Sequence, residues 1–326
     1  MTEGAGRVET VLGPVVPEDL GATLIHEHIL CSSLSLYHYF GESWLRKEEV
    51  IVTAATKLQR LRERYGVTTV VDGTPLNLSR DIRLLAEVSR RSGVHIVAST
   101  GFYHYDDFSY GRISVEDLAG YLLEECAQGA EGTSIRPGIL KCAVEELTPA
   151  AKFLLATVGR VQAATGLPVF VHTAPKRRNT LEALGMLQEA GSAPEKIIVG
   201  HCGDSNDTEY VREILRCGCW VEIDRLRRHQ PEVFARKTAM VANLAQDWLH
   251  RLLISHDYIC YDDRRNDQTR QRLGTVIDED EQGLCLIHEE MLPRLRQCGI
   301  GEAEMEELLC KNPQTVLRPN RRLVSK

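Results

Sequence analysis

The sequence of 326 residues lacks several features that would assign it to other classes of protein. The N-terminal segment MTEGAGRVETVLG has no basic region followed by an apolar stretch, so we expect no signal peptide. No apolar run approaches the ~18 residues that a membrane-spanning helix needs, and no linker rich in proline, glycine or serine divides the chain. A net charge of −7 argues against nucleic acids and membrane surfaces as partners.

Paired cysteines at the spacing of a zinc finger are also lacking. The ten cysteines are scattered, and Cys217 and Cys219 form a C-x-C without a second pair. Several others, including Cys126, Cys285 and Cys310, stand in apolar surroundings. We therefore expect reduced thiols in the core and a cytoplasmic protein.

The sequence does contain a repeated alternation of short β-branched segments and longer amphipathic ones. The predicted strands cover residues 23–28, 67–73, 95–101, 135–141, 168–174, 196–201, 219–224 and 251–257. Helices are predicted between them, for example over 48–66 and 207–218, and a final helical stretch over 302–317 is expected to break at Pro313. Eight such units predict a single-domain (β/α)8 TIM barrel over residues 1–326. The alternative is an open doubly wound sheet, but no glycine-rich phosphate loop follows the first strand.

Residue types that bind metals stand near the ends of the predicted strands. His26 and His28 in LIHEHIL should project from one face of their strand, with Glu27 on the other face. A chain with eleven histidines often contains such a pair by chance, so this pair alone does not predict a metal site. Evidence from the other strands is needed. They contribute residues at equivalent positions: Lys141, His172, His201 and Asp257. A barrel places its chemistry at these strand ends, so a metal centre is predicted there.

The other seven histidines do not fit this pattern. His256 precedes Asp257 and should point away from the lumen of the barrel, as a structural residue. The rest are interpreted as surface or packing residues: His38, His95, His104, His229, His250 and His288.

The donor types suit two divalent metal ions about 3.5–4 Å apart that share a bridging hydroxide. Four neutral imidazoles bring no negative charge, so anionic ligands are needed, and Asp257 supplies one. The amine of Lys141 would be protonated below a pKa of about 10 and would repel a metal. Carboxylation by CO₂ would convert it into an anionic carbamate with one oxygen for each ion. Histidine and carboxylate ligands are compatible with zinc, iron, cobalt or manganese.

Several motifs together resemble the phosphotriesterase-like lactonases of the amidohydrolase superfamily. The resemblance runs from VLGPVVPEDLGATLIHEHIL (11–30) to CKNPQTVL (310–317) and includes GILK (138–141), VHT (171–173), GHCGDSND (200–207), EIDR (222–225) and SHDY (255–258). The ligand set that it implies has His26, His28 and Asp257 on a buried ion, His172 and His201 on a more exposed ion, and carboxylated Lys141 between the two. The resemblance also implies a homodimer.

The same resemblance implies catalytic roles. Asp257 would orient the hydroxide and take its proton, and Asp204 would belong to a proton relay. Tyr103 would contact the lactone ring, although it could instead be a packing aromatic. Arg225 stands where the lactonase branch has arginine and the organophosphate-degrading branch has histidine, and it could instead form a structural salt bridge.

The sequence therefore predicts hydrolysis of a small lactone, with weaker paraoxonase-like activity because a phosphotriester resembles the tetrahedral intermediate. The alternatives are a primary organophosphate triesterase, a carboxyl-ester or amide hydrolase, and a non-catalytic protein that holds a ligand in the metal pocket. Cations in the rim loops would indicate a more polar substrate, such as a sugar lactone or a phosphorylated lactone, if they face the site; otherwise they are solvated surface. They are Lys176, Arg177, Arg178, Arg227, Arg228, Arg264 and Arg265.

Overall fold

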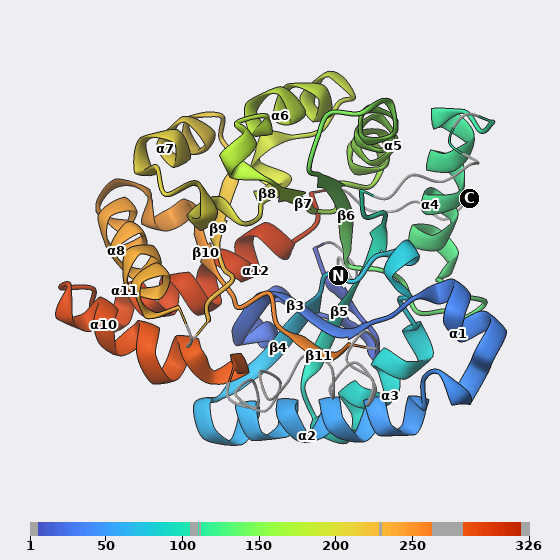
Figure 1. The fold of residues 1–326 in the computed structure, drawn as a ribbon, viewed down its shortest axis with the longest axis horizontal. Helices are drawn as coiled ribbons and strands as arrows, with labels where there is room; N and C mark the ends of the chain where they lie inside the picture. The colour runs from blue at the N-terminus through green and yellow to red at the C-terminus, as the bar shows by residue number, and fades with distance from the viewer. Residues whose placement is uncertain (1–5, 105–109, 111, 228–229, 263–282, 321–326) are drawn as a thin grey trace, which may run out of the picture.

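The eight predicted strands form one parallel sheet in the computed structural model, which describes residues 6–104, 110, 112–227, 230–262 and 283–320. Each strand pairs in parallel with the next one along the chain. Helical segments connect them and surround the sheet (Figure 1), which confirms the predicted TIM barrel. The barrel strands are β3 (Ala22–Cys31), β4 (Val67–Asp72), β5 (His95–Gly101), β6 (Ile139–Val144), β7 (Val169–Thr173), β8 (Ile197–Val199), β9 (Trp220–Ile223) and β10 (Leu252–Ile254).

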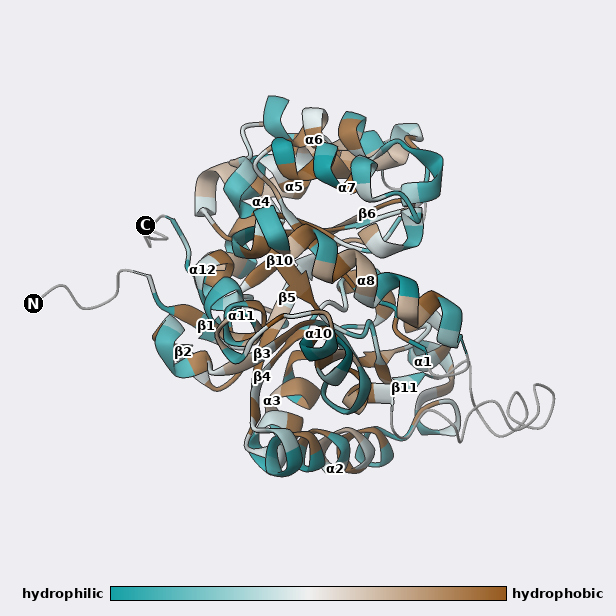
Figure 2. Ribbon diagram, turned by 90° about the vertical axis from the view of Figure 1, so that its left-hand side faces the viewer, coloured by the Kyte–Doolittle hydropathy of each residue, from teal (hydrophilic) through white to brown (hydrophobic). Residues whose placement is uncertain are grey.

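The helices turn one apolar face toward the strands. In α3, for example, the buried side chains include Ile82, Leu85 and Val88, while Arg90 and Arg91 in its last turn are exposed. Figure 2 shows this arrangement as hydrophobic strands inside a shell of helices with hydrophilic outer faces. The helices are α1 (Leu34–Phe40), α2 (Lys47–Tyr65), α3 (Ile82–Ser92), α4 (Val115–Gln128), α5 (Pro149–Thr165), α6 (Thr180–Glu189), α7 (Thr208–Arg216), α8 (Pro231–Trp248), α10 (Leu292–Gln297), α11 (Glu302–Glu306) and α12 (Asn312–Leu317).

The barrel closes where the segment after β10 runs along β3. Asp257 N donates to His26 O at 3.1 Å, and His28 N donates to Tyr258 O at 2.7 Å. A short strand, β11 (Ile259–Asp262), then continues the parallel pairing with β3. Closure therefore places Asp257 directly beside the two histidines of β3. A hairpin of β1 (Val8–Thr10) and β2 (Gly13–Val15) precedes the barrel.

A layer of apolar side chains fills the interior of the barrel on the N-terminal side of the strands' polar residues. Each barrel strand contributes one buried residue to it: Ile25, Val71, Val97, Ile139, Phe170, Ile198, Trp220 and Leu253. Val316 and Leu317 of α12 also belong to this cluster. Two positions further along β6, β7 and β9 the inward residues are Lys141, His172 and Glu222. The polar site thus rests on a close-packed apolar floor.

Several sequence predictions of element boundaries are wrong. The strands predicted to end at His201 and Asp257 end earlier, at Val199 and Ile254, so both residues lie in the segments that follow β8 and β10. The strand predicted over 23–28 extends to Cys31, so His26 and His28 lie inside β3. The strand predicted over 135–141 lies at 139–144, because Pro137 and Gly138 delay its start, so Lys141 lies inside β6 and not at its end. The C-terminal helical stretch does not break at Pro313. A π-helical turn, Glu307–Lys311, connects α11 to α12, and Pro313 lies in the first turn of α12, where its missing N–H is tolerated.

The ten cysteines form no disulfide, and most are buried, as the sequence predicts. Within the described ranges, no helix combines the length and apolar character needed to cross a bilayer. The single-domain organisation of residues 1–326 stays a prediction.

Candidate metal centre

Strand β3 supplies two histidines to the lumen. Its pairing with β4 is irregular between Leu24 and Glu27, and this irregularity lets both Ile25 and His26 face inward. The ring of His26 lies 4.0 Å from that of Phe170 in the apolar floor and 5.1 Å from that of His28, measured between centroids. Glu27 points to the opposite side, as predicted.

The first group of donors converges around His26. Its Nε2 lies 3.0 Å from Nζ of Lys141 and 3.5 Å from Oδ1 of Asp257. The same Asp257 oxygen lies 3.2 Å from Nε2 of His28. Lys141 is 1% exposed, so its amine lies in the interior of the barrel. The four side chains come from β3, from β6 and from the segment after β10.

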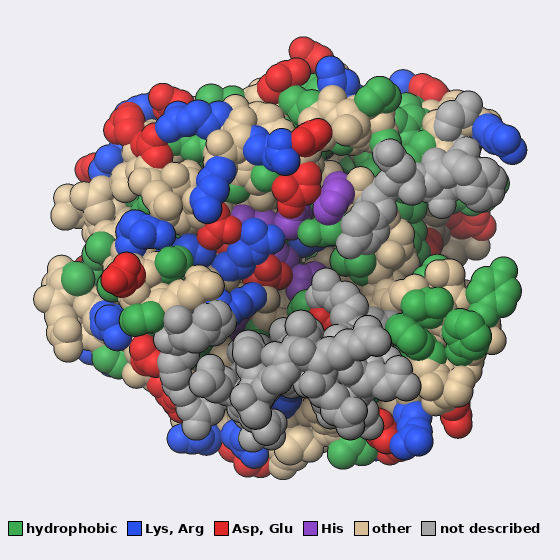
Figure 3. Space-filling view, in the orientation of Figure 1, with side chains coloured by type: hydrophobic (Ala, Val, Ile, Leu, Met, Phe, Trp, Pro, Cys, Tyr) green, Lys and Arg blue, Asp and Glu red, His purple; other side chains and the backbone are tan. Residues whose placement is uncertain are grey.

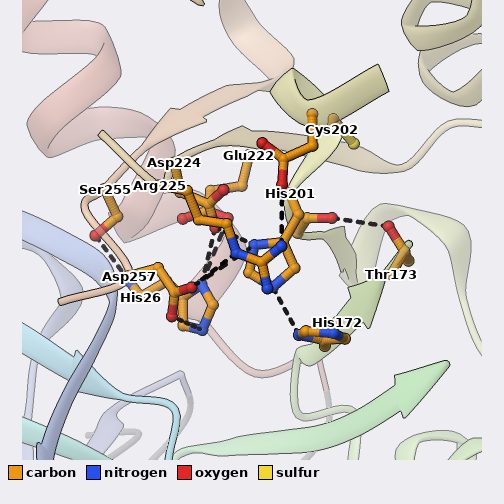
Figure 4. Close-up of polar contacts among 12 residues, drawn as sticks. His26, His172, Thr173, His201, Cys202, Glu222, Asp224, Arg225, Ser255 and Asp257 are labelled. Carbon is orange, nitrogen blue, oxygen red and sulfur yellow. Dashed lines mark hydrogen bonds and ion pairs between the residues drawn. The ribbon is translucent and has the colours of Figure 1, made fainter. Parts of the chain in front are cut away.

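The second group consists of the histidines of β7 and of the loop after β8. Nδ1 of His172 lies 2.7 Å from Nε2 of His201. The rings of His201 and His26 are 5.4 Å apart, so the second group adjoins the first. All six residues that the sequence proposed as ligands are therefore gathered in one place, part of which is drawn in Figure 4.

Each of the four imidazoles is contacted by an oxygen at one ring nitrogen and presents the other nitrogen to the shared space. Oδ2 of Asp224 lies 3.2 Å from Nδ1 of His26 and 2.7 Å from Nδ1 of His201. For the other two rings the partners are Oγ1 of Thr74, 2.9 Å from His28 Nδ1, and Oε1 of Glu145, 2.8 Å from His172 Nε2. Oxygen partners of this kind fix the tautomer and orientation of histidines that bind metals.

Burial and local charges set the protonation states that a metal site needs. Burial and the amine of Lys141 lower the pKa of His26 well below its usual value, and burial and His201 lower that of His172 to about 3. Burial acts to raise the pKa of Asp257, but the facing imidazoles of His26 and His28 outweigh it and hold that pKa well below its usual value. His26 and His172 are thus neutral imidazoles beside an ionised carboxylate. His28 differs: burial acts to lower its pKa, but Cys31 and Asp257 outweigh burial and raise that pKa to about 10, so a metal ion bound there would have to displace a proton from His28.

The backbone is constrained at three residues that follow strands. His201, Arg225 and Asp257 have φ values of 64°, 54° and 54°, in the left-handed region that residues other than glycine seldom adopt. Such strain is typical of functional sites. Gly73 makes room for the donors, because a Cβ at this position would lie 2.9 Å from Cδ2 of His26 and 3.3 Å from Nζ of Lys141.

A cavity of about 680 Å³ opens above these donors. Tyr103 lines it, with its hydroxyl 3.4 Å from Nε2 of His172. Arg225 also lines it and donates from Nε to Asp257 at 3.1 Å and from an Nη to Asp204 at 2.9 Å. Arg225 therefore connects the two acids that the sequence placed in the site. Buried Lys237 of α8 donates to the other oxygen of Asp204 at 2.6 Å.

Several residues around the donors were missed by the sequence reasoning. Glu222 and Asp224 are separated by one residue, like His26 and His28, and this spacing could have identified them as a pair facing the lumen. Burial and the charge of Asp224 raise the pKa of Glu222 well above its usual value, whereas His201 holds that of Asp224 well below it, against burial. Asp224 is thus the ionised member of the pair.

Two sequence interpretations of histidines have different outcomes. His104, interpreted as a surface or packing residue, lies with Glu145 and His172 in a group whose ligand atoms are within 4.8 Å of one another. Tyr103 and His104 follow the end of β5, and their rings lie 4.9 and 6.2 Å from that of His172 on β7, measured between centroids. His256 points away from the lumen, as predicted, and its Nδ1 lies 2.7 Å from Oε1 of Glu27.

The rim cations also separate into groups. Arg227 lines the cavity, whereas Arg177 pairs with Glu146 and Arg178 with Asp207. Arg228, Arg264 and Arg265 lie outside the described residues, as does most of the loop over 259–283.

The barrel and its buried group of histidines and carboxylates are typical of metal-dependent hydrolases. The family model of the phosphotriesterase family matches residues 6–317. The chain belongs to this family, as the sequence motifs predicted.

Curated relatives match along almost the whole chain. The "phosphotriesterase homology protein" of Mycobacterium tuberculosis is 30% identical over 322 residues, covering 95% of this chain and 97% of that protein. The "aryldialkylphosphatase" of Saccharolobus solfataricus is 28% identical, with 91% and 95% covered. The "N-acetyltaurine hydrolase" of Homo sapiens is 27% identical, with 96% and 98% covered.

Proposed function

We propose that this protein hydrolyses lactones at a centre of two divalent metal ions and has weaker phosphotriesterase activity. The observation that carries this proposal is the arrangement of the four imidazoles, each held through one ring nitrogen and open at the other. His26, His28 and Asp257 would hold one ion, His172 and His201 the other, and carboxylated Lys141 would bridge them. Ions bound there would act as Lewis acids toward the substrate carbonyl and lower the pKa of a bound water from about 15.7 toward 7.

The protein's own residues would bind the substrate and move the proton. Asp257 is ionised and contacted by Arg225, which supports a role as proton acceptor: it would take a proton from the attacking water and deliver it toward the alkoxide leaving group. Asp204, on the other side of Arg225, offers a route for that proton away from the site. Tyr103 lines the cavity, and its hydroxyl would donate a hydrogen bond to the oxygen that becomes negative in the transition state.

Carboxylation of Lys141 is supported by its surroundings. Burial lowers the pKa of the amine to about 8, and only an unprotonated amine attacks CO₂. A bond forms between Nζ and the carbon of CO₂, and the nitrogen releases a proton. The resulting carbamate carries the negative charge that neutral imidazoles do not provide.

Metal analysis of the purified protein tests the centre. We expect close to two divalent ions per chain and complete loss of turnover after chelation; fewer than one ion would contradict a binuclear site. We also propose that the metal is zinc and that the protein is a homodimer. The same metal analysis identifies the metal, and the mass of the protein in solution gives its oligomeric state.

A substrate panel tests the reaction. It should contain acyl-homoserine lactones, aliphatic lactones, sugar lactones, paraoxon and N-acetyltaurine, and we expect lactones to have the highest kcat/KM. The relatives named aryldialkylphosphatase and N-acetyltaurine hydrolase favour organophosphate and amide hydrolysis as the next candidates. Paraoxon or N-acetyltaurine in first place would assign the corresponding activity instead, and metal without any turnover would indicate a binding protein.

A further inference from the structure

A second cavity of about 300 Å³ adjoins the metal cavity. Arg225 and Arg227 line both of them, so these two side chains lie at the boundary between the two spaces. Lys176, from the turn after β7, and Arg236, from α8, line the second cavity but not the metal cavity. Figure 3 shows lysine and arginine side chains gathered beside the histidines at this face of the molecule. Three separate elements therefore bring cations to one hollow.

The positive charge of this cavity is not balanced by its acidic lining. Asp204 is the one carboxylate among its described lining residues, and it is already paired with Arg225 at 2.9 Å and Lys237 at 2.6 Å. Lys176 and Arg236 have no carboxylate partner within the described part of the chain.

Arg227 is held in place without being neutralised. It donates to the main-chain oxygens of Leu226, His256 and Asp257 at 3.0, 3.1 and 3.3 Å. Carbonyl oxygens fix a guanidinium while leaving its full positive charge available to a ligand. The neighbouring cations Arg177 and Arg178 differ, because each pairs with a carboxylate and neither lines this cavity.

We propose that this second cavity binds an anionic group of the substrate, a carboxylate, sulfonate or phosphate, through Lys176, Arg227 and Arg236. Oxyanions of this shape suit guanidinium and ammonium donors. The inference rests on the proposed function, because it places the scissile carbonyl at the metal site and the anion beside it. The guanidinium of Arg225 contacts both Asp257 at the metal site and Asp204 in the second cavity, so the two sites lie close together. We therefore expect only a few bonds between the scissile carbonyl and the anionic group of the substrate.

A matched set of lactones tests this inference on the metal-loaded enzyme. The set is γ-butyrolactone with a carboxylate on the ring carbon beside the ring oxygen, and its methyl ester as a neutral analogue of similar size. We expect kcat/KM to favour the carboxylate by about tenfold or more, and high salt to reduce the preference. A ratio near one, or a preference for the ester, would overturn the inference while leaving lactone hydrolysis established.

Substitutions locate the effect. Arg236→Gln and Lys176→Gln should each lower the ratio of carboxylate to ester turnover severalfold, whereas Arg177→Gln, an adjacent exposed cation outside the cavity, should leave the ratio unchanged. An equal fall in all three variants would indicate a general charge effect and overturn the assignment to this cavity.

Binding of methanesulfonate, a weak metal ligand, gives a readout that does not require turnover. Calorimetry should show binding to the wild-type holoenzyme and weaker binding to Arg236→Gln. If no lactone is hydrolysed but this difference is found, the anion site stands and only the proposed lactonase reaction fails. If methanesulfonate binds neither protein, or both equally, the anion site is refuted.

Discussion

Asp224 Oδ2 lies 2.7 Å from Nδ1 of His201, at the base of the proposed centre. The same oxygen also lies 3.2 Å from Nδ1 of His26. In the proposed ligand set these two histidines belong to different ions. One buried carboxylate therefore orients an imidazole from each half of the centre, and its loss should weaken both halves together.

We predict that Asp224→Asn lowers the affinity for both metal ions by roughly 10-fold to 100-fold, the usual cost of losing such an orienting partner. Titration of the metal-free protein with zinc measures this effect. Glu222→Gln is a matched control, because Glu222 is held protonated and an amide has nearly the same shape. We expect this control to bind metal almost normally. Equal losses in the two variants would show that Asp224 has no special role.

The parts of this site that follow strand periodicity could be predicted from the sequence. His26 and His28 point together because side chains alternate along β3, and Lys141 and His172 lie two positions beyond Ile139 and Phe170 of the apolar floor. The barrel itself followed from eight repeats of strand and helix.

The parts that depend on irregular backbone could not be predicted in this way. Glu145 and Thr74 reach their histidines from loops, and Lys237 reaches Asp204 from α8. Their positions follow from loop paths and helix packing, which alternation does not encode. The π-helical turn before Pro313 is a similar case, because a local change of helix type removes the conflict that predicted a break.

Lys141→Ala should abolish turnover and leave less than one bound ion per chain, because the bridging anion is lost. A short carboxylic acid such as propionate, added with metal, should restore part of the activity by occupying the space of the missing side chain. Metal content and turnover with and without propionate measure this result. Full activity of the variant without propionate would remove the carbamate from the proposal.

The pH dependence of reconstitution should report the state of Lys141. Its pKa lies at about 8, below the usual 10.5, so the unprotonated fraction of the amine increases as the pH rises toward 8 and levels off above it. At constant dissolved CO₂, the rate at which activity returns to the metal-free protein should rise about 16-fold between pH 6.5 and 8 and only about twofold more by pH 9.5, in proportion to the unprotonated fraction. Continued acceleration up to pH 9.5 would indicate an ordinary lysine pKa, and independence from CO₂ would contradict carboxylation.

Glu27 should contribute strongly to stability, because it fixes the segment that closes the barrel. Its Oε1 accepts hydrogen bonds from Ser255 Oγ at 2.7 Å and from the backbone N–H of His256 at 3.0 Å, and its Oε2 accepts from Tyr258 N at 2.8 Å, all in the buried interior. In Glu27→Gln a side-chain NH₂ group replaces one of the two acceptor oxygens, so at least one buried donor loses its acceptor. This substitution should lower the free energy of unfolding by about 3 kcal/mol. Urea denaturation at fixed metal concentration measures the loss. Glu49→Gln is the control, since the exposed pair of Glu49 with Arg46 should contribute at most about 0.5 kcal/mol. A similar small loss in both variants would mean that Glu27 does not secure the closure that positions Asp257.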